Sequence, residues 1–362
     1  MTAASSTSPV DHDAQGRPAR ATGRATARRE LQAAAIALLA SIAIVSVLML
    51  VAGKAPGTVW WAMVTRTASD PYQLGQVLYR ATGLMLTGLA VAIALDAGLF
   101  NIGAEGQVTA GVLACALVGS SLPASTPSVI AILLCVLAAA AAGGVVGGAI
   151  GALRVWRGAH EVITSIMLNA IVIGIALYLG NRFIFRNGTT TGSPIAPGAE
   201  LPQLGIGGST ANASIVIAVI AVAIVWWLRA QTRWGQAWRA VGQSPEAART
   251  TGISVGRVQT VAMIGSGMLA GLAATNFVLG HKHAFEAGLG SGTGLAGISV
   301  ALLGRMHPLG VVLAALVIGF VSVAALAVGD LVPKELIEML PAVVVLAAAA
   351  AGPWMRRAEA SR

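Results

Sequence analysis

Apolar runs of about 20 residues recur along most of this chain, and they restrict its possible folds more than any other feature. A run of that length is what an α-helix needs to cross the hydrocarbon layer of a bilayer. Hydrophobic residues make up 56% of the chain and charged residues only 10%, whereas a soluble domain has about 25% charged residues. The sequence therefore predicts an all-α, polytopic membrane protein with about ten transmembrane helices.

The basic residues are distributed as expected for such a protein. A scheme with ten spans and the N-terminus inside places 16 of the 23 Lys and Arg residues in cytoplasmic segments and 7 outside. Cytoplasmic loops are enriched in Lys and Arg, so this bias predicts a cytoplasmic N-terminus. Topology thus explains the net charge of +9, and the aromatic residues, 5% of the chain, are too few and scattered for base stacking. No nucleic-acid partner is expected.

Composition divides the chain into three parts. Residues 1–30 are polar and rich in Arg, which predicts a disordered basic arm in the cytoplasm. Residues 31–352 are expected to form one transmembrane domain, and residues 353–362 a cytoplasmic tail. Within the domain, the longest external loop is expected over about 181–212 and a cytoplasmic loop over about 230–257.

The segment between the first two spans has an amphipathic character. Residues 53–80 mix polar and apolar side chains and include Trp60, Trp61 and Tyr72. Trp and Tyr favour the headgroup region of a bilayer. We therefore expect this segment to lie along the outer membrane interface, with the second span beginning near residue 81.

The cytoplasmic loop contains a short helix with its own start and stop signals. Ser244 is a good N-cap, and Pro245 suits the first helical position, where no N–H is needed. Glu246 lies near the positive end of the helix dipole, and Gly252 provides a stop, because glycine adopts the left-handed conformation at little cost. The sequence predicts a helix of about two turns on the cytoplasmic side.

The fourth span, about residues 128–152, has a strip of glycines. Gly143, Gly147 and Gly151 are spaced by four residues, which places them on one face of a helix. Small residues at this spacing allow another helix to approach closely. We expect the strip to serve helix packing.

Two glycine-rich stretches interrupt the apolar pattern. The first, Asp96–Gln107, is too polar for a lipid-facing helix, and the second covers residues 288–304. Irregular backbone at membrane depth must be buried in protein or line a cavity, and paired interrupted helices are a pointer to a transport pathway. The alternative for the first stretch is a tight turn at the membrane surface.

Five segments match motifs of one protein family. Glu246–Gly252 resembles an EAA loop, and Leu99–Gln107 closely resembles the signature LFNIGAEGQ. His160–Asn169, Ser266–Ala273 and Gly288–Pro308 resemble the runs HEVI–TIMLN, SGALAGLAG and GFDGIAVALLGRNHP. These motifs are typical of the permease subunits of ABC importers for nucleosides, simple sugars and branched-chain amino acids. The last segment departs at residues 294–296, where an aromatic and an acid are usual, which weakens any transfer of substrate contacts there.

The resemblance is greatest to nucleoside permeases and extends over roughly residues 75–350. It implies a transport subunit, not an enzyme, in the cytoplasmic membrane of a bacterium. In the family the EAA loop forms the coupling helix that docks on the ATPase. For this chain the resemblance assigns that role to the following residues: Ser244, Pro245, Glu246, Ala247, Ala248, Arg249 and Gly252.

The resemblance also implies partners. These are a separate ABC ATPase that binds ATP and Mg²⁺, a second permease subunit, and an external lipid-anchored substrate-binding protein, all at a lipid membrane. Family members of this type commonly pair two different permeases, so a heterodimer is expected, with a homodimer as the alternative. The chain itself needs no cofactor or metal.

Polar residues in the spans are candidates for the substrate pathway. Nucleosides are neutral and polar, so amides suit them better than charges, and buried ionisable groups in membranes are functional candidates by default. Hydrogen bonding between helices is the alternative role. The candidates are Asn101, Glu105, Gln107, Asn169 and Asn276.

Other classes of function remain open. The phosphate-binding loop G-x-x-x-x-G-K-[ST] does not occur, because the one Gly-Lys pair, Gly53–Lys54, is followed by Ala55; ATP would therefore bind elsewhere. A sugar such as ribose is the alternative substrate. An ion-coupled transporter would need a cycling acid, for which Glu105 or Asp96 is available. A channel or scaffold would not need the capped cytoplasmic helix.

Overall fold

The computed structural model describes residue 39 and residues 42–185 and 189–332 of this chain. The described part is almost entirely helical, which confirms the predicted all-α class. Three predicted parts lie outside the described residues: the arm over 1–30, a tenth span over about 337–352 and the tail over 353–362.

Six helices of the described part are long and apolar enough to cross a membrane, or up to seven if one bent pair counts as a span. The bent pair consists of the helix Ile42–Val51 and α2 (Pro56–Ser69), which meet at 120°. The six are α3 (Pro71–Asp96), α5 (Ser128–Arg157), α6 (Glu161–Leu179) with η1 (Gly180–Ile184), α7 (Ser214–Gln231), α10 (Val255–Ala274) with η3 (Thr275–Lys282) and α12 (Pro308–Ala327).

Helices α4 and α11 are not among these six helices, although the sequence predicts membrane-spanning segments in both regions. Helix α4 (Ala104–Ser121) coincides with the third predicted span but begins with a polar turn that contains Glu105 and Gln107. Helix α11 (Thr293–Leu303) lies within the second glycine-rich stretch, residues 288–304, and has only 11 residues. At 1.5 Å per residue it is about 16 Å long, whereas the hydrocarbon layer is about 30 Å thick. An apolar run was therefore present without a spanning helix.

Helix α10 packs against α5 through the predicted glycine strip. A Cβ atom at Gly143 would overlap the carbonyl oxygen of Gly267, and one at Gly147 would overlap that of Met263. A Cβ atom at Gly271 would overlap the carbonyl oxygen of Ala139. The two backbones thus touch along several turns, which confirms the expected packing role of the strip.

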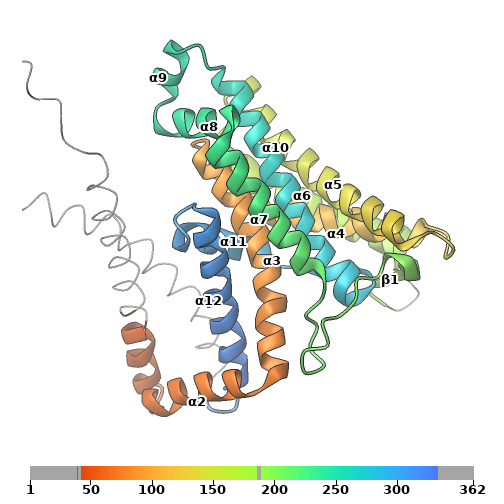
Figure 1. Ribbon diagram of the computed structural model, residues 1–362, viewed down its shortest axis with the longest axis vertical. Helices are drawn as coiled ribbons and strands as arrows, with labels where there is room; N and C mark the ends of the chain where they lie inside the picture. Colours follow the sequence, from red (N-terminus) through yellow and green to blue (C-terminus); the bar gives the residue numbers. More distant parts are fainter. Residues whose placement is uncertain (1–38, 40–41, 186–188, 333–362) are drawn as a thin grey trace, which may run out of the picture.

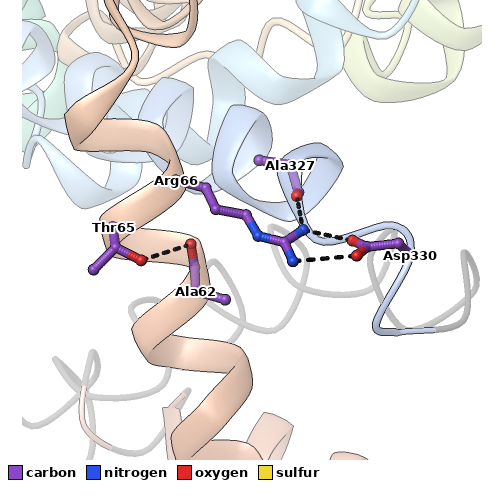
Figure 2. Close-up of polar contacts among 5 residues, drawn as sticks. All are labelled: Ala62, Thr65, Arg66, Ala327 and Asp330. Carbon is purple, nitrogen blue, oxygen red and sulfur yellow. Dashed lines mark hydrogen bonds and ion pairs between the residues drawn. The ribbon is translucent and has the colours of Figure 1, made fainter.

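Helix α2 lies across one end of the molecule, next to the end of α12 (Figure 1). Figure 2 shows how Arg66 joins the two helices: its guanidinium donates to the Ala327 carbonyl at 2.9 Å and to the two Asp330 carboxylate oxygens at 2.6 and 3.2 Å. The predicted interfacial segment is thus a separate helix only as far as Ser69. Residues 71–80 already belong to α3, because Pro71 starts that helix and Asp70 accepts the Tyr72 N–H.

Segments that the sequence assigns to one side of a membrane lie together. Helices α8 (Arg233–Gln243) and α9 (Pro245–Thr250) occupy the end opposite to α2 (Figure 1). Toward the other side, β1 (Thr191–Pro194) in the predicted external loop pairs antiparallel with β2 (Ala284–Glu286), and the 3₁₀ turn η2 (Pro197–Ala199) follows β1. The predicted cytoplasmic helices and the predicted external loop thus lie in different parts of the molecule.

Candidate functional site

Helix α9 is the short capped helix that the sequence predicts. The Ser244 hydroxyl accepts a hydrogen bond from the Ala247 N–H at 3.3 Å, and Pro245 occupies the first position. Gly252 has a φ of +82°, so a left-handed residue follows the helix, as expected for glycine. At six residues the helix is slightly shorter than the predicted two turns.

One side of α9 is fixed to the protein and the other is free. Ala248 is 3% exposed, so its methyl group anchors the helix. The side chains of Glu246, Ala247 and Arg249 are exposed. A carboxylate and a guanidinium are therefore presented at the end of the molecule, in a geometry that suits a protein partner.

The last turn of α8 touches the turn that follows α3. A Cβ atom at Gly242 would overlap the carbonyl oxygen of Asp96, and Gly98 approaches the Gly242 Cα so closely that an added Cβ would lie 3.2 Å from it. Gly98 has a φ of +72°, which favours glycine. The exposed helix pair is therefore in direct contact with the first interrupted stretch.

An ion pair lies beside this contact. The Arg229 guanidinium donates to the Asp96 carboxylate from Nε at 2.7 Å and from Nη2 at 3.2 Å, which joins the ends of α3 and α7. His307, in the turn before α12, lies near the pair. Burial and the nearby charge of Arg229 lower the pKa of His307.

Asn101 and Gln107 form one buried cluster in the first interrupted stretch. Asn101 Nδ2 donates to Gln107 Oε1 at 2.8 Å and to Ser266 Oγ at 2.7 Å, and Gln107 Nε2 donates to Asn101 Oδ1 at 3.1 Å. Ser266 in turn donates to the Ala90 carbonyl at 2.5 Å. Both amide side chains are fully buried, so the cluster fixes the stretch against α10 and α3.

Asn169 of α6 holds the same stretch from another side. Its Oδ1 accepts the Gly106 N–H at 2.8 Å, and its Nδ2 donates to the Ile102 carbonyl at 3.0 Å. Backbone groups in this irregular segment would otherwise lack partners inside the protein. The predicted alternative of a simple surface turn does not describe this stretch, because it is buried and bonded to several helices.

Glu105 connects the two interrupted stretches, which the sequence predicts to border one pathway. Its side chain accepts the N–H groups of Gly292 at 2.5 Å, Gly294 at 3.0 Å and Leu295 at 3.3 Å. These N–H groups belong to the start of α11, where a helix dipole favours a negative charge. Glu105 is 8% exposed. Its carboxylate thus stabilises the end of a helix that begins inside the molecule.

Asn276 has a separate set of hydrogen-bond partners. Its Oδ1 accepts hydrogen bonds from Asn212 Nδ2 at 3.1 Å and Ser214 Oγ at 3.0 Å, and its Nδ2 donates to the Tyr79 carbonyl at 3.0 Å. These bonds join η3, α3 and the start of α7. Asn276 is 1% exposed.

A cavity with a volume of about 580 Å³ lies between α3, η3, the loop before α11 and α12. Its polar and aromatic lining includes Gln76, Tyr79, Phe277, His281, Ser291 and Thr293. None of these residues was a sequence-based candidate. A second cavity of about 330 Å³ borders the same loop and includes Glu105. The signal in the sequence for this site was an aromatic residue, Tyr79, near the start of a long helix. It was missed because the helix was predicted to begin near residue 81, whereas α3 begins at Pro71.

Within the described residues, no group of three or more His, Cys, Asp or Glu side chains is arranged to hold an ion. His281 and His283 are the one pair with suitable spacing in sequence, and within the described residues they have no such companions.

Comparison with known proteins agrees with these features. The guanosine ABC transporter permease protein NupP of Bacillus subtilis is 33% identical over 318 residues, 86% of this chain and 90% of that protein. The nucleoside ABC transporter permease protein NupB of Lactococcus lactis is 29% identical, over 86% of this chain and 88% of its own length.

A sugar permease is equally similar. The glucose ABC transporter permease protein TsgB13 of Haloferax volcanii is 33% identical over 86% of this chain and 85% of that protein. The family model described as branched-chain amino acid transport system / permease component matches residues 73–349. The match includes α3 to α12, and thus both the exposed helix α9 and the buried stretches. The chain is a multi-pass membrane protein that belongs to this family of ABC transporter permeases.

Proposed function

We propose that this chain imports nucleosides across the cytoplasmic membrane of a bacterium, driven by ATP hydrolysis on a separate ABC ATPase. The ATPase docks on α9, through the exposed residues between Glu246 and Gly252. In this proposal α9 and the N-terminus lie in the cytoplasm, and the chain crosses the membrane about ten times, with α11 as a broken span.

The observation that best supports coupling through α9 is the contact that the preceding helix, α8, makes with the turn after α3. The helix is exposed on one side, is anchored by Ala248, and follows α8, whose Gly242 touches the turn after α3. In this proposal, a movement of α9 on the ATPase moves α8 and, through Gly242, the stretch that holds Asn101 and Glu105. A surface helix with no partner would not need this contact.

The nucleoside assignment is supported by the relatives whose names state guanosine and nucleoside transport. The glucose permease supports a second candidate, a simple sugar such as glucose or ribose. Both substrates are neutral and polar. The bonded amides of Asn101, Gln107, Asn169 and Asn276 then act on the pathway by holding its walls, and rearrangement during transport would expose them to substrate.

The proposed assembly contains two permease subunits, two ATP sites and an external lipid-anchored binding protein. ATP and Mg²⁺ bind to the ATPase alone. Two different permeases are favoured, with two copies of this chain as the alternative. An ion-coupled mechanism is the less favoured alternative, because both acids available to it already have partners: Glu105 is bonded to three backbone N–H groups and Asp96 is paired with Arg229.

The test is uptake of labelled uridine, adenosine and guanosine in cells with and without this gene, with unlabelled ribose, glucose and leucine as competitors. The proposal expects nucleoside uptake to be lost with the gene and unaffected by the competitors. Loss of sugar uptake with normal nucleoside uptake would keep the permease role and change the substrate. Uptake in reconstituted vesicles that persists without ATP would contradict the importer itself.

A further inference from the structure

The cavity beside Tyr79 lies in the half of the molecule opposite to α9. Gln76 and Tyr79 are in the first third of α3, whereas Asp96, the last residue of that helix, pairs with Arg229 beside α8. In the orientation proposed above, the cavity is in the outer half, where substrate would arrive. A volume of about 580 Å³ is within the range of small-molecule sites.

The cavity has an aromatic wall. The rings of Tyr79 and Phe277 meet edge to face with centroids 6.1 Å apart, and the ring of His281 lies edge to face with Tyr79 at 5.4 Å. Phe277 is 7% exposed and is fixed by packing against Gly83 and Gly290. Tyr79 is half-buried, so part of its ring faces the cavity. Flat rings of this kind bind nucleobases by stacking.

Polar groups around this wall have unused hydrogen-bonding capacity. Within the described part of the chain, the side-chain hydroxyls of Tyr79, Ser291 and Thr293 form no hydrogen bond, and the Gln76 side chain has one bond, in which its Oε1 accepts from Thr210 at 3.1 Å. The Gln76 amide N–H groups remain available. Donors and acceptors of this kind match the edge of a base.

The charges of the cavity favour a neutral ligand. The N–H groups at the start of α11, which would attract an anion, are occupied by the Glu105 carboxylate. Lys282 is paired with Glu286 at 2.6 Å. Arg80 is exposed at the rim. A phosphate group would thus meet one rim cation and no free helix terminus among the described lining residues.

From this geometry we infer that the cavity is a nucleoside site, in which the base lies against Tyr79 and its edge bonds to Gln76, Ser291 and Thr293. The inference rests on the nucleoside import proposed above and adds residues that determine selectivity. A sugar lacks the flat base that the aromatic wall accommodates, so the site distinguishes nucleosides from hexoses.

The first test compares Kd values for labelled guanosine of the purified membrane complex without the external binding protein, because that protein would determine the KM of uptake. Tyr79→Leu removes the ring and is expected to raise Kd about tenfold, the effect of losing one base-stacking contact. Tyr79→Phe keeps the ring and is expected to change Kd less than Tyr79→Leu. Tyr72→Leu is the matched control, because Tyr72 is on the same helix, exposed, and outside the cavity.

Equal Kd values for Tyr79→Leu and Tyr72→Leu would overturn the site and leave nucleoside import intact. Uptake of glucose but not guanosine by the unaltered importer would overturn both proposals. Guanine that competes as well as guanosine supports recognition of the base, whereas competition by ribose alone contradicts it.

A second test does not depend on the stability of a Tyr79 variant. Ser291→Cys places a thiol in the exposed loop of the cavity, and Ser69→Cys places one at the exposed end of α2, outside the cavity lining. In membrane vesicles that contain the complex, guanosine is expected to slow maleimide labelling of Ser291→Cys severalfold and to leave that of Ser69→Cys unchanged. Equal labelling rates of Ser291→Cys with and without guanosine would overturn the inference.

Discussion

The exposed helix α9 and the buried pair of interrupted stretches are held by opposite kinds of interaction. In α9 the cap joins Ser244 to Ala247, three residues away. In the buried pair, Glu105 accepts N–H groups that lie 187 to 190 residues away. The cap of α9 joins residues that are close in sequence, so this helix can form without contacts from distant parts of the chain. The bonds of the buried pair join residues far apart in sequence, so these bonds form only when the whole fold is in place. Substitutions in α9 should therefore affect coupling, and those in the pair should affect stability.

The largest loss of stability is expected for Glu105→Ala. The N–H groups of Gly292, Gly294 and Leu295 would lose their acceptor inside the protein, at a cost of about 3 kcal/mol. Thermal unfolding of the purified permease in detergent measures the effect. Glu246→Ala is the matched control, because Glu246 is also a first-turn glutamate but is exposed. Equal unfolding temperatures for the two variants would contradict the contrast between the regions.

A smaller loss is expected for Gly242→Ala, at the contact between the regions. The added methyl group would overlap the Asp96 carbonyl oxygen, and overpacking of this kind costs about 1–3 kcal/mol. Substrate-stimulated ATP hydrolysis should fall together with the unfolding temperature. Gly265→Ala is the control, since no atom lies within 4 Å of its added Cβ, and it should be neutral. Normal substrate-stimulated ATP hydrolysis by the Gly242→Ala importer would show that this contact does not couple the ATPase to the transport domain.

Loss of the α9 cap is expected to have a still smaller effect on stability. Ser244→Ala leaves the Ala247 N–H without its acceptor, which costs about 1 kcal/mol and is confined to a helix of six residues. The global unfolding temperature should barely change, while coupled ATP hydrolysis falls. Ser69→Ala is the control, because Ser69 is exposed at the end of α2 and its hydroxyl caps no N–H but donates to the Thr65 carbonyl; it should change neither. A large drop in the unfolding temperature of Ser244→Ala would show that the stability of the whole protein depends on α9, which contradicts the contrast.

The smallest effect is expected at the exposed pair that joins α2 to the end of α12. The Arg66 guanidinium holds the pKa of Asp330 below its usual value by a hydrogen bond and by its charge. A carboxyl with a depressed pKa stabilises the folded state above its unfolded pKa, about 3.9, and the contribution is lost as the pH falls through the folded value. Arg66→Gln should therefore lower the unfolding temperature slightly at pH 7 and less as the pH falls below that range. A difference of the same size at every pH would exclude the ion pair as its cause.

The same contrast explains what the sequence could predict. Ser244, Pro245 and Gly252 act within a few residues, so the position of α9 was correct, and the spacing of Gly143 and Gly147 revealed the packing strip. The start of α3 was missed, although Asp70 and Pro71 are a normal helix start, because Trp60 and Trp61 suggested a single interfacial segment.

Distant relationships were beyond the sequence. The glycines of residues 288–304 indicated an interrupted helix, but they did not reveal where α11 begins and ends. The candidates Asn101, Gln107, Asn169 and Asn276 were found because they are polar residues in apolar runs, but their bonding partners come from other helices. The cavity beside Tyr79 forms only where α3, η3 and the loop before α11 meet in the folded protein. No single segment of the sequence contains enough of its lining residues to predict it.

The proposed coupling through α9 is tested most directly by a photoreactive amino acid placed at Glu246 in the assembled importer, with the same residue at Glu200 as control. Glu200 is exposed and lies in the predicted external loop. Illumination is expected to join the Glu246 variant to the ATPase subunit and to leave the Glu200 variant free of it. If position 246 gives no product with the ATPase, or position 200 gives the same product, α9 is not the docking helix.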